Sequence, residues 1–397
     1  MLLIAAPGQG AQTPGFLLPW LELPGFAARL EAWSELAGCD LIAAGTTADA
    51  DEIRDTAVAQ PLLVAAAMAA AIDEIVTGAH PLSPESVAVA GHSVGELAAG
   101  VLAEVISPED AMRLVAVRAQ GMAAAAAAEP TGMTAVLGGD EAEVLAAIDA
   151  HGLTPANVNG AGQIVAAGTM AQLAAFAASP PARARLRPLS VAGAFHTHHM
   201  SPAVDALAAA AQTVRAADPV RTLLSNRDGA VVKSGPDWLD RIINQVSAPV
   251  RWDRCMQTME SLGVTALIEL PPGGTLTGLA KRTLRGIQLV ALKTPDDLDA
   301  ARALLAEHDD SHDDHHAPEW RLVVSPAGGT YRAADGHPQA AEPGTLIGLD
   351  SDLGYIEVRG GNRQVAATFP ATVIEWLVED GDPVSPGQPL VRLLPAE

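Results

Sequence analysis

Cysteine is scarce in this sequence. Only two of the 397 residues are cysteines, Cys39 and Cys255. Two thiols cannot build a disulfide framework, and they are too few for a metal site made of thiolates. We therefore expect a protein of a reducing compartment, the cytoplasm, with no metal.

Positive charge is also in short supply. Lys and Arg number 24 against 47 Asp and Glu, which leaves a formal net charge of −23. A strongly negative surface repels phosphate and lacks the basic footprint that gives non-specific affinity for nucleic acid. The composition excludes nucleic-acid binding driven by overall charge. An anionic partner would have to bind at a local basic patch.

The sequence has no long hydrophobic run. The longest run, Leu62 to Ile72, has 11 residues, whereas a membrane-spanning helix needs about 20. We expect this run to form a buried core helix. The start, Met1–Pro7, carries no basic residue and is expected to be a strand entering a turn rather than a targeting signal. Neither a membrane span nor a leader is expected.

What the sequence does have is apolar content, with 49% hydrophobic residues. Over residues 1–306, short β-branched runs alternate with long Ala-rich stretches of helical character. This alternation predicts an α/β fold with parallel strands. The predicted strands are Leu2–Ala6, Val87–Ala90, Ile164–Ala167 and Ala266–Leu270.

Residues 132–192 have a different pattern and predict a small inserted subdomain. Its expected order is β-α-β-α-β, because three β-branched runs alternate with two helix-forming stretches. The expected strands and helices are Met133–Leu137, Asp140–His151, Gln163–Ala167, Met170–Ala178 and Leu186–Val191.

The composition changes at residue 307. Residues 307–319 are rich in Asp and His and have no apolar periodicity, which predicts a solvated acidic linker. His308, His312 and His316 are four residues apart, but the flanking Asp pairs disfavour a helix interior, so we expect no metal site there. Residues 320–397 predict a small all-β domain. Its expected strands are Leu322–Val324, Tyr355–Val358, Val365–Phe369 and Val373–Leu377.

The most informative segment is Gly91-His-Ser93-Val-Gly95. It follows a predicted strand and precedes an Ala- and Leu-rich helix, which is the arrangement of a nucleophile elbow. The glycines permit the tight turn, and the helix N-terminus favours the oxyanion that forms when Ser93 attacks a carbonyl. We predict that Ser93 is a catalytic nucleophile.

A serine nucleophile needs a base at neutral pH, and the strongest candidate is His196. The residues alone do not choose among His196, His198 and His199. The loop Gly8–Gln12 follows the first predicted strand, so it is expected where active-site loops gather. Its main-chain N–H groups either complete an oxyanion hole or form an ordinary glycine-rich turn.

Six motifs connect these features. The segments Gly8–Gln12, Gly91–Glu96, Arg118, Asn157–Gln163, Ala194–His196 and Gln245–Val250 occur in a set order and spacing. In both respects the chain resembles the malonyl-CoA:acyl carrier protein transacylases, especially the actinobacterial type, over about residues 1–295. The resemblance implies a hydrolase-like α/β core with a ferredoxin-like insert.

The same resemblance implies a role for each matching residue. Ser93 is then the nucleophile and His196 its base. Arg118 binds the malonyl carboxylate, a task that suits the planar fork of a guanidinium. The resemblance further implies that Gln9 and Val94 form the oxyanion hole and that the Gln245 carbonyl orients the histidine.

The implied reaction is a ping-pong transfer. Ser93 accepts malonyl from malonyl-CoA, and the phosphopantetheine thiol of acyl carrier protein then takes it, for fatty-acid or polyketide synthesis. No cofactor and no metal are needed. Phe195 resembles a residue of malonyl-selective domains, but one methyl gives only about 1–3 kcal/mol of discrimination, so we expect some leakage to methylmalonyl.

Acyl carrier protein is acidic, and so is this chain. Screening over about 8 Å lets a nearby basic patch dominate. Where the family places its carrier contacts, this chain has Lys281 and Arg282; the alternative patch is Arg183, Arg185 and Arg187. Residues 307–397 hold 5 basic and 16 acidic residues. Much of the net charge therefore belongs to the tail rather than to the proposed docking site.

Residues 320–397 resemble, more weakly, a biotinyl/lipoyl-type barrel-sandwich domain. The resemblance is carried by Val378–Leu390, with Ser325–Tyr331 as its opening. Functional carriers have a lysine on a hairpin, whereas this chain has Ile356–Asn362 there and no lysine after Lys293. Attachment of biotin or lipoate to a lysine of this domain is therefore excluded. We expect the tail to dock a further protein, oligomerise or be a relic.

Two other functions compete with malonyl transfer. The Ser93 motif suits a serine esterase or thioesterase of the α/β-hydrolase type equally well. The tail, for its part, suits an adaptor that brings a malonyl-CoA-producing carboxylase near the transferase. Arg118 and the Gly8–Gln12 loop favour transfer over hydrolysis.

Overall fold

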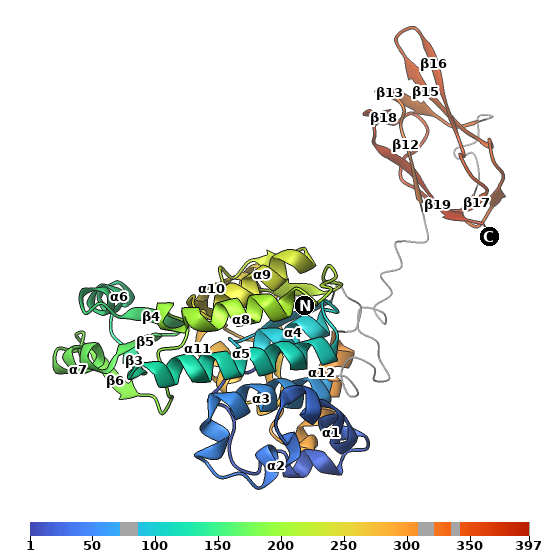
Figure 1. Cartoon of the computed structure of the whole chain (residues 1–397). Coiled ribbons are helices and arrows are strands. Elements are labelled where there is room, and N and C mark those ends of the chain that lie inside the picture. The colour runs from blue at the N-terminus through green and yellow to red at the C-terminus, as the bar shows by residue number, and fades with distance from the viewer. Residues whose placement is uncertain (72–85, 309–320, 335–341, 397) are drawn as a thin grey trace. The chain divides into compact units, whose positions relative to one another are not determined.

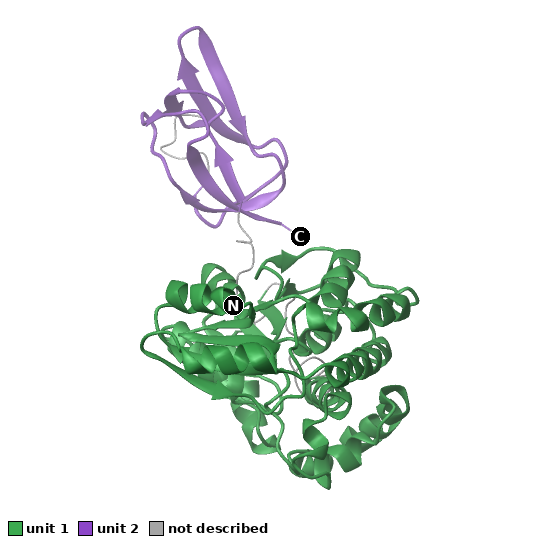
Figure 2. Cartoon of the chain, turned by 60° about the vertical axis from the view of Figure 1, so that its left-hand side comes forward, with its two compact units in different colours: residues 1–310 green, residues 311–397 purple. Residues whose placement is uncertain are grey.

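The structure is a computed structural model that describes residues 1–71, 86–308, 321–334 and 342–396. The chain divides into two compact units, Met1–Asp310 and Ser311–Glu397 (Figures 1 and 2). Most of the acidic segment 307–319, including His312 and His316, lies outside the described residues.

A six-stranded sheet forms the core of the first unit. Its strand order is β11-β10-β1-β2-β7-β8, and every neighbouring pair is parallel except β7 with β8. The predicted parallel α/β core is therefore correct. The strands are β1 (Leu2–Ala6), β2 (Val87–Gly91), β7 (Thr222–Leu224), β8 (Val231–Val232), β10 (Ala266–Glu269) and β11 (Gln288–Ala291).

Helices cover both faces of this sheet. Side chains alternate along β1, so Leu2 and Ile4 pack into one buried cluster and Leu3 and Ala5 into another. Burial on both faces is what an alternating βα sequence with near-continuous apolar strands produces. The first face is covered by α1 (Phe26–Ala37), α3 (Thr56–Ala71), α4 (Gly95–Leu102), α5 (Pro108–Ala128), α8 (Ser201–Ala211), α9 (Gly235–Gln245) and α12 (Leu298–Glu307), and the second by α10 (Trp252–Ser261) and α11 (Thr275–Thr283).

Shorter elements connect these helices. They are η1 (Leu18–Glu22), α2 (Leu41–Thr46), η2 (Glu52–Arg54), η4 (His198–Met200) and η5 (Pro295–Asp297). The apolar run that begins at Leu62 is the buried part of α3, as expected up to Ala71; Ile72 lies outside the described residues. No helix of the described residues is long and apolar enough to cross a membrane.

A second sheet begins where α5 ends (Figure 1). Its order is β6-β3-β5-β4-β9, in which the first four strands are antiparallel and β9 is parallel to β4. The chain order from β3 to β6 is β-α-β-β-α-β. The elements are β3 (Thr131–Gly138), α6 (Glu141–Ala150), β4 (Thr154–Gly160), β5 (Gln163–Thr169), α7 (Met170–Ala178), β6 (Ala184–Pro188) and β9 (Val250–Arg251).

Two sequence-based expectations about this region are wrong. Ile164–Ala167 belongs to β5 and pairs antiparallel with β3 and β4, so it is not a strand of the parallel core. The expected strand Leu186–Val191 ends at Pro188. A further strand, β4, was not expected, because its Pro155, Asn157 and Gly160 are residue types that strands disfavour; pairing on both sides overrides that preference.

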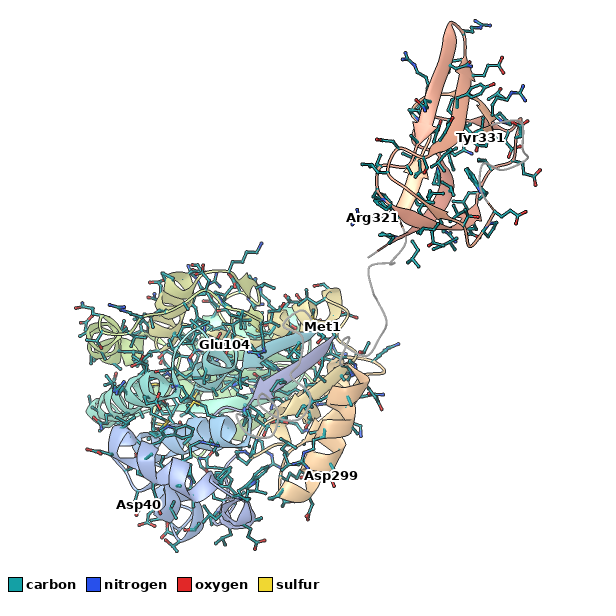
Figure 3. All side chains as sticks on the ribbon, turned by 90° about the vertical axis from the view of Figure 1, so that its right-hand side faces the viewer. Met1, Asp40, Glu104, Asp299, Arg321 and Tyr331 are labelled. Atoms are coloured by element: carbon teal, nitrogen blue, oxygen red, sulfur yellow. The ribbon has the colours of Figure 1, made fainter. Side chains whose placement is uncertain are left out.

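The second unit consists of two four-stranded antiparallel sheets, β12-β19-β17-β14 and β16-β15-β13-β18. Their inner faces enclose a common cluster that contains Tyr331, whose hydroxyl donates to the Leu353 carbonyl at 2.7 Å (Figure 3). The all-β prediction is correct. The strands are β12 (Arg321–Val324), β13 (Gly329–Arg332), β14 (Leu346–Ile347), β15 (Asp352–Val358), β16 (Gly361–Ala366), β17 (Ala371–Trp376), β18 (Pro383–Val384) and β19 (Pro389–Pro395).

All four expected strands of the second unit overlap observed strands but differ in their bounds. The expected strand Val365–Phe369 overlaps only the end of β16, which stops at Ala366, and Val373–Leu377 belongs to β17, which stops at Trp376. The other two, Leu322–Val324 and Tyr355–Val358, start later than β12 and β15. The segment Ile356–Asn362 forms the hairpin between β15 and β16, with Val358 paired to Gly361. Arg359 and Gly360 form its exposed tip.

Candidate active site

Ser93 occupies a strained turn between β2 and α4. Its φ is +54°, in the left-handed region that side chains rarely adopt, at a cost of about 1–3 kcal/mol. The two glycines beside it are required by space. A Cβ on Gly91 would lie 2.0 Å from the carbonyl carbon of Gly95, and one on Gly95 would lie 2.3 Å from the oxygen of Ala6. The turn has the tight strand–turn–helix geometry that a nucleophile elbow requires.

His196 is the histidine that reaches Ser93. Its Nε2 lies 2.7 Å from Ser93 Oγ, and its Nδ1 lies 2.8 Å from the main-chain oxygen of Gln245. The carbonyl can only accept, so Nδ1 carries the proton and Nε2 is free to accept one from the hydroxyl. Gln245 ends α9, which brings the carbonyl to the histidine. The three predicted residues Ser93, His196 and Gln245 therefore lie together.

The other two histidines of the segment are engaged elsewhere. His199 Nδ1 lies 2.8 Å from the carboxylate of Glu129, and the exposed His198 ring lies against the His199 ring. Of the three histidines, His196 is the one that contacts Ser93 in the structure.

Arg118 lies buried beside Ser93, on α5. Its Nη2 donates to Ser93 Oγ at 3.3 Å and to Gln245 Oε1 at 2.9 Å, and its Nη1 donates to Gln60 Oε1 at 2.6 Å. These contacts use three of the five N–H groups of the guanidinium. A fixed positive charge with donors to spare therefore lies within reach of whatever is attached to Ser93.

Burial and charge set the protonation of this cluster. Burial, together with the Arg118 charge, lowers the pKa of His196 to about 3, so the ring is neutral at pH 7. Burial also lowers the pKa of Arg118 to about 10. In Glu96, burial raises the pKa to about 8, against the opposing effect of hydrogen bonds and of Arg118. A neutral imidazole is the form that can take a proton from serine.

The expected oxyanion donors lie on two neighbouring loops. Val94 is the N-cap residue of α4, and Gln9 follows β1, which is hydrogen-bonded to β2. Within the described parts of the chain, neither main-chain N–H donates to a protein acceptor. The Gln9 side chain is anchored through Nε2 to Arg54 O and Thr56 Oγ1, both at 3.3 Å.

A cavity of about 360 Å³ opens onto Ser93. The core contributes Gln9, His92 and His196 to its lining, the insert contributes Asn159 and Gln163, and Phe195 lies at its wall. His92 Nε2 lies 2.9 Å from Asn159 Oδ1 and so links the core to the insert. The cavity lies between the two sheets and is large enough for an acyl group with part of its carrier.

Helix α11 closes one side of the cavity through Thr275, Leu276 and Leu279. The buried carboxylate of Glu269 accepts four main-chain N–H groups at the start of this helix, from Gly274 to Thr277, which fixes its orientation. The expected docking residues Lys281 and Arg282 are exposed in its last turn. Those of the alternative patch, Arg183, Arg185 and Arg187, are exposed along and beside β6.

Sequence reasoning missed three polar residues of this site. Gln60 holds Arg118, Glu96 accepts from Gln245 Nε2, and Asn226 accepts from the Ser93 N–H. Only Glu96 had a signal, as the last residue of the family segment Gly91–Glu96. Among the residues that the structure describes, no three His, Cys, Asp or Glu side chains gather as metal ligands would.

Comparisons with known proteins point to one family. The acyl transferase domain family matches residues 6–317. The chain is 54% identical to the malonyl CoA-acyl carrier protein transacylase of Mycobacterium tuberculosis over 299 residues, which are 75% of this chain and 98% of that protein. It is 33% identical to that of Escherichia coli over 306 residues, with coverage of 75% and 97%.

Solved structures of similar proteins have the same fold. The crystal structure of MCAT from Mycobacterium tuberculosis matches with a TM-score of 0.72 and 53% identity, over 76% of this chain and 99% of that one. A malonyl-transacylase solved in complex with its type II PKS acyl-carrier protein matches with a TM-score of 0.69 and 29% identity, over 76% and 98%. These matches cover about three quarters of the chain.

Proposed function

The chain belongs to the malonyl-CoA:acyl carrier protein transacylases of the acyl transferase family, and we propose the roles of its residues on that premise. The enzyme transfers malonyl from malonyl-CoA to acyl carrier protein, as its relatives are named for doing. The observation that carries the residue assignment is the contact of Ser93 Oγ with both His196 Nε2 and Arg118 Nη2.

In the first half-reaction, Ser93 Oγ attacks the thioester carbonyl of malonyl-CoA. His196 Nε2 takes the hydroxyl proton, and the Gln245 carbonyl holds Nδ1–H so that the ring keeps the required tautomer. As the tetrahedral intermediate collapses, the C–S bond breaks and the proton returns from Nε2 to the departing thiolate. The products are free CoA and a malonyl ester of Ser93.

Arg118 selects the acyl group by its carboxylate. Two of its N–H groups are not engaged by the described residues, and Gln60 and Gln245 fix the plane of the guanidinium. A malonyl carboxylate bound to this fork also neutralises the positive charge that depresses the pKa of His196. Binding of the correct substrate thus makes His196 a stronger base at the moment it is needed.

The Val94 and Gln9 N–H groups stabilise the oxyanion. The Ser93 N–H is not available for this task, because it donates to Asn226 Oδ1 at 2.7 Å. This role is supported for Gln9 by its place in the cavity lining and for Val94 by its position directly after Ser93, and neither N–H donates to an acceptor within the described residues.

In the second half-reaction, the thiol of the phosphopantetheine arm attacks the Ser93 ester. His196 takes the thiol proton and returns it to Ser93 Oγ, which restores the free enzyme. We propose that Lys281 and Arg282 contact the acidic carrier protein. This is supported by their exposure on α11, whose first turn lines the cavity.

Hydrolysis is not favoured as the main reaction. A serine esterase needs no buried arginine beside its nucleophile, whereas Arg118 lies 3.3 Å from Ser93 Oγ. The curated relatives are named as transacylases.

We also propose finer descriptions of the fold. The insert is ferredoxin-like, which is supported by its β-α-β-β-α-β chain order and antiparallel pairing. The second unit is a biotinyl/lipoyl-like domain of about residues 320–397 that cannot carry a group on lysine and acts as an adaptor. This is supported by its two-sheet sandwich and the hairpin tip at Arg359. The cytoplasmic location stays a prediction.

The function is tested by assaying malonyl transfer from malonyl-CoA to a phosphopantetheinylated acyl carrier protein. We expect stoichiometric malonyl-carrier protein, and no transfer by Ser93→Ala. Release of free malonate at the same rate with and without carrier protein would point to the hydrolase instead.

A further inference from the structure

Asn226 lies directly behind the nucleophile, outside the substrate cavity. It follows β7, the parallel neighbour of β2, so the chain after β7 runs beside the chain after β2. Asn226 is fully buried and is absent from the cavity lining. The side chain of Asn226 makes its hydrogen bonds to the turn at Ser93 and to Cys255, so any part it plays in the reaction passes through the residues it contacts.

The carboxamide of Asn226 bonds to both sides of the elbow. Its Oδ1 accepts the Ser93 N–H at 2.7 Å, and its Nδ2 donates to the Gly91 carbonyl at 2.8 Å. An amide is the one small side-chain group that offers an acceptor and a donor in this fixed geometry. The pair of bonds spans the turn that holds Ser93 at a positive φ.

Asn226 is itself held at both main-chain groups. Its N–H donates to Glu96 Oε1 at 2.8 Å, and its carbonyl accepts from the N–H of Arg251 at 2.8 Å. The other Glu96 oxygen accepts from Gln245 Nε2, and that same nitrogen donates to Ser93 O at 3.2 Å. Since the Gln245 carbonyl holds His196, one buried carboxyl group connects the support of the nucleophile to the support of the base.

We propose that Asn226 is a positioning residue for the acyl transfer. Its carboxamide fixes the turn so that Ser93 Oγ meets His196 Nε2, and it takes up the Ser93 N–H so that Val94 supplies the oxyanion donor from the elbow. This assignment rests on the proposed function, because it needs Ser93 to be the group that is acylated. Small displacements of a reacting group can cost about 100-fold in rate.

The test measures the single-turnover rate of malonyl-Ser93 formation at several malonyl-CoA concentrations. Asn226→Leu keeps the branched shape of the side chain but loses both bonds, and we expect a fall of about 100-fold in the limiting rate. The malonyl-CoA concentration for half-maximal rate should change less than about threefold, since Asn226 does not line the cavity. Asn226→Asp keeps the acceptor for Ser93 N–H but loses the donor to Gly91, and should lie between Asn226→Leu and the parent.

A matched control separates position from stability. Leu304→Ala removes a buried side chain of α12 that is not part of the cavity lining, so it lowers the melting temperature and should leave the rate unchanged. The proposal is overturned if Asn226→Leu acylates within threefold of the parent, if the asparagine variants weaken saturation without slowing the limiting rate, or if Leu304→Ala slows acylation equally. If Asn226→Leu does not fold, the limiting rate and the saturation of Asn226→Asp test the proposal in its place. Failure of the parent itself to acylate would refute the proposed function instead.

Discussion

Arg118 Nη2 and Ser93 Oγ are 3.3 Å apart, although the arginine lies in the middle of α5 and the serine in the turn before α4. A permanent positive charge in a buried site costs free energy unless an opposite charge compensates it. A malonyl group bound to Ser93 provides that opposite charge, because its free carboxylate lies a short distance from the ester.

Replacement of Arg118 should therefore affect substrates unequally. Arg118→Ala should lower kcat/KM for malonyl-CoA by at least about 100-fold, which corresponds to about 2.7 kcal/mol, and should affect acetyl-CoA far less. Arg118→Lys keeps the charge but not the fork, and should recover only part of the loss. Steady-state kinetics with both donors provide the measurement, and equal losses for malonyl and acetyl would refute the carboxylate-binding role.

The depressed pKa of His196 predicts the pH dependence of acylation. With a pKa of about 3, the ring stays neutral well below pH 6.5, the ordinary value for histidine. The rate of malonyl-Ser93 formation at limiting malonyl-CoA should therefore show no loss between pH 8 and pH 5. A fall of the rate with a midpoint near 6.5 under these conditions would contradict the account.

Glu96 predicts a stability that depends on pH. Its folded pKa of about 8 lies above the value of about 4.5 expected when unfolded, so the folded state holds an extra proton between these two values. The contribution of Glu96 to the free energy of unfolding is therefore fully present below pH 4.5 and is lost as the pH rises to about 8. The melting temperature of Glu96→Gln relative to the parent should rise over that interval. A constant difference would show that the carboxyl group does not titrate there.

Charge reversal on α11 should weaken the second half-reaction only. The double variant Lys281→Glu with Arg282→Glu should raise KM for acyl carrier protein several-fold, mostly at low salt, and leave malonyl-Ser93 formation unchanged. Arg215→Glu, a single charge reversal at another exposed arginine, serves as the control, to be compared with Lys281→Glu and Arg282→Glu made one at a time. A rise in KM from reversal of Arg185 and Arg187 instead would move the docking site to β6.

Removal of the second unit should leave transfer intact. A chain that ends at Asp310 keeps the whole first compact unit, including every residue assigned to the reaction. We expect the same kcat/KM for malonyl-CoA and for the isolated carrier protein. An inactive but folded truncated enzyme would refute the adaptor role of the tail.

The sequence was sufficient for the features that depend on local rules. The elbow at Ser93 follows from glycines between a strand and a helix, and the parallel core follows from the alternation of apolar runs. Features that depend on distant partners were not predictable. Strand β4 forms in spite of Pro155 and Asn157, because β5 and β9 pair with it.

The polar support of the site was missed for the same reason. Asn226 and Gln60 are single polar residues without a motif. Their roles depend on contacts with Ser93 and Arg118, which lie 133 and 58 positions away in the sequence. The residues alone also left His196, His198 and His199 open, since three histidines within four positions have no local difference in pattern, and only the resemblance to the transacylases singled out His196.

The central claim is that Ser93 carries malonyl between two thiols, and intact-protein mass measurement after rapid mixing with malonyl-CoA tests it most directly. The account predicts a mass increase of one malonyl group, located on the Ser93 peptide, that disappears when phosphopantetheinylated acyl carrier protein is added and reappears on the carrier. Absence of the adduct, with malonyl-CoA converted to free malonate, would contradict it.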